Sequence, residues 1–122
     1  MKSKLLLPCV VAIVALMTTS CYNDSEEALY PAGCDTTNVS YSQTIQPILS
    51  QNCNSCHNST ENNAGVITEN YNDLITHVNS GIFWKAVNHE TGVVPMPFEG
   101  QKLQQCDLDR IKAWIDNGAP NN

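Results

Sequence analysis

The chain has 122 residues and a formal net charge of −6, with six Lys and Arg residues against twelve Asp and Glu residues. This balance argues against a nucleic-acid-binding surface, which needs a basic stripe. The length allows one small folded domain with a limited hydrophobic core.

The first segment, residues 1–20, has the features of a secretory signal peptide. Lys2 and Lys4 precede an apolar run over residues 5–17, and small residues follow the run up to Cys21. The run is too short for a membrane-spanning helix, which needs about 20 apolar residues. We therefore expect an exported protein, located in the periplasm or at the outer-membrane face.

The sequence LMTTSC at the end of this segment resembles the lipobox of bacterial lipoproteins, in which the cysteine becomes the acylated N-terminus. Thr18 stands where that family usually has leucine. The resemblance implies that Cys21 carries a lipid anchor, and ordinary cleavage with a free N-terminus is the alternative. Residues 21–39 are acidic and polar, which predicts a tether between the anchor and a domain over residues 40–122.

Apolar residues at helical spacing predict a first helix in this domain. The helix would be capped by Ser42 and would end near Cys53. Pro47 fits such a helix only in its first turn, or if the helix begins irregularly. The apolar residues are Tyr41, Ile45, Ile48 and Leu49.

Three further helices are expected, and no strand-like alternation occurs, so the predicted fold is all-α. Residues 71–79 form the second helix, which Gly81 stops. Residues 82–88 form a short third helix, and residues 107–117 form the last one. The apolar residues of the last helix are Leu108, Ile111, Trp114 and Ile115.

Residues 53–57, CNSCH, match the CxxCH signature of c-type haem attachment. Cys53 and Cys56 can each form a thioether with a porphyrin vinyl group, and His57 can present its imidazole to the iron. A structural zinc site is one alternative, but it needs four ligands, and the sequence has no second Cys/His pair. A thioredoxin-like dithiol is the other, but it expects a strand before the motif.

Met96 is the one methionine after the leader, and it lies between two prolines in VVPMPFEG. Proline restricts the backbone, so this stiff loop could hold a thioether toward the iron as its second protein ligand. His77 and His89 are the competing ligands. An open sixth position, or a Met96 that only fills a gap in the core, are the remaining alternatives.

Besides Cys21, two cysteines lie outside the leader and the motif. Cys34 precedes the domain, and Cys106 precedes the last helix. Exported proteins in an oxidising compartment seldom keep such thiols free. We therefore predict a disulfide between Cys34 and Cys106.

Five sequence features together resemble small monohaem cytochromes c of the class I type: IQPIL, CNSCH, YNDL, PMP and RIKAWIDNGA. The resemblance spans about residues 40–120 and implies three to four helices wrapped around one covalent haem c. It implies thioethers at Cys53 and Cys56, with His57 and Met96 as the axial iron ligands. The implied activity is one-electron transfer rather than catalysis, by a monomer that contacts redox proteins transiently.

The resemblance also implies that the first helix crosses the last, with Ile45 and Leu49 packed against Ile111, Trp114 and Ile115. One departure is that no proline lies between His57 and Pro95, where many relatives have one whose carbonyl accepts the axial histidine's second N–H. We expect another carbonyl near residues 65–67 to accept it. The residues expected to cover the porphyrin are Phe83, Val93, Val94, Phe98 and Leu103.

Two alternative functions remain open from the sequence. In a haem-based sensor, Met96 would be displaced by a small ligand such as carbon monoxide or nitric oxide. In the other alternative, the domain would be an obligate haem subunit of a larger oxidoreductase.

Overall fold

The computed structural model describes residues 33–122; the predicted leader, Cys21 and most of the predicted tether lie outside the described residues. Clustering of contacts separates the unit Cys34–Asn122 from the residues before it. This unit begins before the predicted boundary at residue 40. Val39 is buried, and the sulfur atoms of Cys34 and Cys106 are 2.10 Å apart, at disulfide distance.

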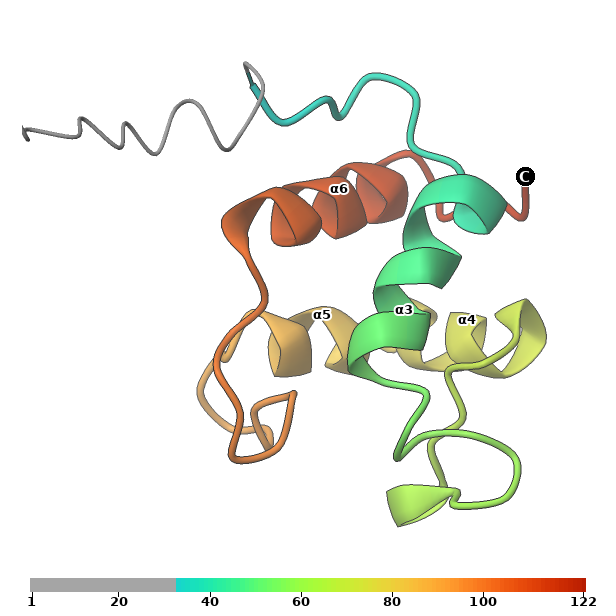
Figure 1. Cartoon of the computed structure of the whole chain (residues 1–122), viewed down its shortest axis with the longest axis vertical. Coiled ribbons are helices and arrows are strands. Elements are labelled where there is room, and N and C mark those ends of the chain that lie inside the picture. The colour runs from blue at the N-terminus through green and yellow to red at the C-terminus, as the bar shows by residue number, and fades with distance from the viewer. Residues whose placement is uncertain (1–32) are drawn as a thin grey trace, which may run out of the picture. The chain divides into compact units, whose positions relative to one another are not determined.

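The secondary structure of residues 33–122 is helical, without strands, which confirms an all-α fold for this part of the chain (Figure 1). None of these helices combines the length and the apolar character needed to cross a bilayer. The elements are η2 (Tyr41–Ile45), α3 (Gln46–Asn52), η3 (Asn63–Gly65), α4 (Tyr71–Asn79), α5 (Ile82–Val87) and α6 (Gln105–Asp116).

The first helical segment begins irregularly, as Pro47 requires. Proline has no N–H and is tolerated in the first turn of an α-helix, and Pro47 lies in the first turn of α3. The preceding turn, η2, has π-helical hydrogen bonding. The predicted cap at Ser42 is wrong, because the side chain of Ser40 accepts the hydrogen bond from the Gln43 amide, at 3.1 Å.

The last residue of the chain binds the start of this segment. The amide of Ser42 donates to the backbone oxygen of Asn122, and the amide of Tyr41 donates to the Asn122 side-chain oxygen, both at 2.9 Å. The first N–H groups of a helix have no partner within it. Asn122 supplies two of these partners, and Figure 1 shows the C-terminus beside η2.

The core joins the first helical segment to the last. Helix α6 contacts η2, and Ile45, Leu49, Ile111 and Trp114 are all fully buried in one cluster. These are the residues expected to pair, and Ile115 packs against the cluster while remaining partly exposed. Apolar burial of this kind stabilises a fold by roughly 25 cal/mol per Å² removed from water.

Helices α4 and α5 complete the unit beside α3. Helix α4 has the predicted bounds; the Asn70 side chain caps it by accepting from the Asp73 amide, at 3.1 Å. Gly81 adopts a left-handed backbone conformation (φ 78°) between the two helices, which glycine tolerates without strain. Because this turn is short, α4 and α5 contact each other and together form one side of the site described next.

Candidate functional site

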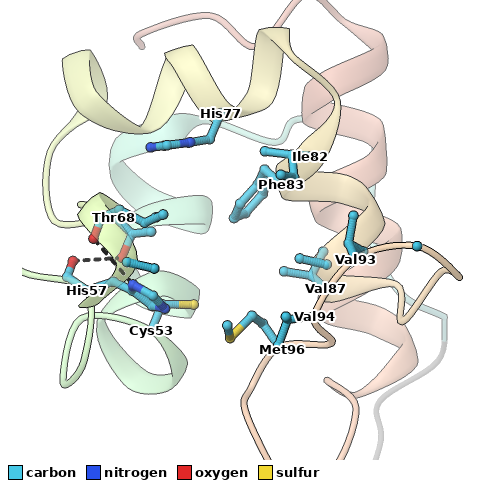
Figure 2. A pocket seen from close by; sticks show the side chains of 14 residues that line it. Cys53, His57, Thr68, His77, Ile82, Phe83, Val87, Val93, Val94 and Met96 are labelled. Atoms are coloured by element: carbon cyan, nitrogen blue, oxygen red, sulfur yellow. Dashed lines mark hydrogen bonds between the residues drawn. The ribbon is translucent and has the colours of Figure 1, made fainter. Parts of the chain in front are cut away.

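A pocket of about 410 Å³ is enclosed by the end of α3, helices α4 and α5, and the loop after α5 (Figure 2). Its volume is within the range of about 300–1,000 Å³ that is usual for ligand sites. The walls are mainly apolar and include Phe83, Val87, Val93 and Val94. Such a pocket suits a mostly apolar ligand with a few polar attachment points.

The CxxCH segment forms a turn directly after α3. The amide of Cys53 still bonds to the Leu49 carbonyl (2.8 Å), and the amide of His57 bonds to the Cys53 carbonyl (3.0 Å). This i to i+4 bond places the side chains of Cys53 and His57 on the same side of the turn. Both therefore line the pocket.

The two motif cysteines have different surroundings. Cys53 is largely buried, and this burial raises the pKa of its thiol to about 11. Cys56 is exposed, and neither cysteine forms a disulfide. The thioredoxin-like alternative expects a strand before the motif, whereas helix α3 precedes it.

The ring of His57 is oriented by a backbone carbonyl. Its Nδ1 atom is 3.3 Å from the carbonyl oxygen of Val66. Because a carbonyl can only accept, this contact requires hydrogen on Nδ1 and leaves Nε2 available as a metal ligand. The acceptor lies within the expected residues 65–67.

Thr68 braces the backbone of the same histidine. The Thr68 amide donates to the His57 carbonyl at 2.8 Å. Its hydroxyl is 3.2 Å from that carbonyl and 2.8 Å from the side-chain oxygen of Asn54. Thr68 is the one polar residue among the buried residues of the described unit, at 4% exposure. A buried polar side chain with these partners stabilises one position of the motif relative to the pocket wall.

Met96 lines the pocket from the opposite wall. Figure 2 shows the sulfur atoms of Met96 and Cys53 directed into the space between the two walls. The amide of Met96 donates to the carbonyl of Ala86, at 3.0 Å, which attaches the loop to α5. The pocket thus presents an imidazole on one side and a thioether on the other.

The two competing histidines have different positions. His77 lines the pocket from α4, beside Ile82 and Phe83 in Figure 2, and it is partly exposed, as its place on the helix predicted. The Nε2 atom of His89 is instead 2.9 Å from the carbonyl oxygen of Met96. His89 is therefore engaged with the backbone of the methionine loop.

The apolar cover differs in part from the expectation. Phe83, Val93 and Val94 line the pocket, as expected. Phe98 and Leu103 do not: Phe98 is 67% exposed, and Leu103 is buried in the main core cluster. Helical periodicity could have indicated further lining residues on α5. Val87 lies one turn after Phe83, and Ala86 lies one turn after Ile82, and all four residues line the pocket.

The residues present fit an iron porphyrin better than a bare metal ion. Within residues 33–122, no three His, Cys, Asp or Glu side chains gather closely enough to hold a metal ion. A porphyrin supplies the equatorial nitrogens itself, so haem needs only axial ligands from the protein. His57 and Met96 offer such ligands, and Cys53 lies at the same pocket.

No family model, curated protein or solved structure matches the chain.

Proposed function

We propose that this protein is an exported monohaem cytochrome c that carries one electron at a time. The observation that supports this best is the shared pocket of Cys53, His57 and Met96, three residues from two separate segments. Cys53 and Cys56 attach the haem through thioethers, and His57 and Met96 are its axial ligands. The bound haem supplies the iron that is reversibly oxidised and reduced.

The protein groups around the haem favour ferrous iron. A methionine ligand raises the reduction potential relative to a second histidine, and an apolar environment disfavours the added charge of ferric iron. The pocket wall supplies that environment through Phe83, Val87 and Val93. The Val66 carbonyl opposes this effect in part, because it accepts the Nδ1 hydrogen of His57 and so makes the imidazole a stronger donor, which favours ferric iron.

Electron transfer rather than catalysis follows from filled axial positions. With His57 and Met96 both bound to iron, no coordination site remains for a substrate. A lipid on Cys21 and the acidic segment after it would hold the carrier near membrane-bound redox proteins. Contact with such partners would be transient, and the acidic balance of the chain would favour basic partner surfaces.

The test is the production of the full chain in cells that mature c-type cytochromes. We expect haem that stays attached after denaturation, with the mass of the mature chain raised by one haem. The oxidised protein should show the weak long-wavelength band that marks methionine sulfur bound to ferric haem. A Cys53→Ser/Cys56→Ser variant is the control and should yield no attached haem.

Two outcomes would change the conclusion. A colourless exported protein from these cells would rule out the cytochrome. Attached haem without the methionine band, together with rapid carbon monoxide binding to the reduced protein, would favour the small-ligand sensor.

A further inference from the structure

His89 occupies a backbone conformation that a histidine seldom adopts. It follows the end of α5 with a φ of 57°, in the left-handed region. Such a conformation is uncommon for a non-glycine residue and persists where surrounding contacts hold it. The residue is partly buried, and its ring makes a defined contact.

That contact is a hydrogen bond to the backbone of Met96. The His89 Nε2 atom is 2.9 Å from the Met96 carbonyl oxygen. Since a carbonyl oxygen can only accept a hydrogen bond, Nε2 must carry hydrogen and donate it. The distance is typical of a well-formed N–H···O bond.

Hydrogen bonds therefore restrain both the amide and the carbonyl of Met96. Its amide donates to the Ala86 carbonyl at 3.0 Å, and its own carbonyl accepts from His89. The amide of His89 also bonds to the Ala86 carbonyl, at 3.2 Å. These three hydrogen bonds link the C-terminal end of α5, His89 and Met96 in one closed arrangement.

We propose that His89 is a positioning residue, whose Nε2 hydrogen bond holds the Met96 backbone so that the thioether stays directed at the haem iron. This role rests on the proposed haem function. A loop restrained in the bound conformation loses less freedom when its ligand binds. Loss of the hydrogen bond should therefore increase the fraction of molecules in which Met96 has left the iron.

Two variants of matched size separate the hydrogen bond from the shape of the side chain. His89→Gln keeps an N–H donor at the end of its side chain. His89→Glu has nearly the same shape but, when ionised, has no donor for the Met96 carbonyl. Both place a straight side chain on the same left-handed backbone position. Thr91→Glu, at an exposed residue of the same loop, controls for the added negative charge.

The readouts are the methionine-to-iron band of the oxidised protein and the rate of carbon monoxide binding to the reduced protein. We expect His89→Glu to weaken the band and to speed carbon monoxide binding about tenfold, the size of effect one hydrogen bond can have. His89→Gln and Thr91→Glu should resemble the wild type. A His89→Glu protein that matches the wild type, or a His89→Gln protein as impaired as His89→Glu, would overturn the role.

If the wild-type protein lacks the band, Met96 ligation and the role of His89 are both overturned. If the wild type has the band and His89→Glu matches it, only the role of His89 is overturned. A second measurement needs no variant. Nitrogen-15 NMR of the reduced wild-type protein should show hydrogen on Nε2 of His89. A His89 ring with its hydrogen only on Nδ1 would overturn the proposal even if the variants failed to fold.

Discussion

Thr68 holds the carbonyl oxygen of His57 with two donors, its backbone amide at 2.8 Å and its hydroxyl at 3.2 Å. The single hydroxyl hydrogen is shared between this carbonyl and the Asn54 side chain, at 2.8 Å. The contact links the CxxCH turn to the segment that leads into α4.

Thr68→Val should destabilise the haem-loaded protein by about 1–3 kcal/mol. Valine keeps the shape but leaves the side-chain oxygen of Asn54, in a partly buried residue, without its donor. Denaturant unfolding measures the change. Thr60→Val, at an exposed position of the same loop, should have little effect. Equal effects of the two substitutions would show that the Thr68 hydroxyl contributes nothing.

The rings of Tyr41 and Tyr71 pack edge to face, with their centroids 5.2 Å apart. The Tyr71 hydroxyl donates to the Ala119 carbonyl at 2.8 Å, whereas the buried Tyr41 hydroxyl has no hydrogen-bond partner. Burial is the larger cause of the raised pKa of Tyr41, and the neighbouring Tyr71 is the smaller one. Tyr41→Phe should leave the free energy of unfolding unchanged or raise it, and Tyr71→Phe should lower it by about 1 kcal/mol. A loss at Tyr41 as large as that at Tyr71 would contradict this.

The Cys34→Ser/Cys106→Ser variant should be less stable than the wild type. A disulfide across a sequence separation of 72 stabilises a fold by roughly 4 kcal/mol in the chain-entropy model. Denaturant unfolding with and without reductant measures it. Reductant should destabilise the wild type and leave the variant unchanged. Reactive thiols at Cys34 and Cys106 in denatured protein without reductant would rule the bridge out.

Met96→Ala should leave the haem attached and lower the reduction potential. The expected shift is on the order of 0.1 V, a part of the roughly 0.8 V over which axial ligands set haem potentials. Potentiometric titration measures it, and Val94→Ala, at the same pocket wall, is the control. If the potential of Met96→Ala equals that of the wild type, the second ligand lies elsewhere, with His77 as the next candidate.

In protein without haem, an alkylating reagent should modify exposed Cys56 before buried Cys53. Burial raises the Cys53 pKa from 9.0 to about 11, so its reaction should become fast only near that pH. Between pH 9 and 11, the folded chain therefore keeps the Cys53 thiol proton that the unfolded chain has lost. The free energy of unfolding should fall as the pH rises through this range. Mass spectrometry of digested protein measures both sites. Equal reactivity would mean that the haem-free chain does not keep this fold.

Helix positions could be predicted well from the sequence where local signals agree. Helix α4 has apolar residues at helical spacing and a glycine after its end, and its bounds are as predicted. The first segment could not be predicted as well, because the π-helical turn before Pro47 departs from the period of 3.6 residues. Helix α6 starts at Gln105 rather than Asp107, a difference usual at helix ends.

The site could be predicted only where a motif specifies its residues. Cys53 and His57 follow from CxxCH, and Met96 follows from being the one methionine after the leader. The roles of Thr68, His77 and His89 depend on contacts between segments that no local pattern encodes. The same limit explains Phe98, whose apolar character predicted cover for the pocket although its side chain faces solvent.

The place where the chain enters the unit has a mechanical consequence. Cys34 is the first residue of the unit, and its sulfur is at disulfide distance from that of Cys106 in α6. Tension along the preceding residues would pass through this link into α6. The pocket-lining residues all lie between Cys53 and Met96, and neither Cys34 nor α6 contributes to them. If the proposed anchor at Cys21 pulls on the unit, the pull would therefore enter the unit at α6 rather than at the pocket wall.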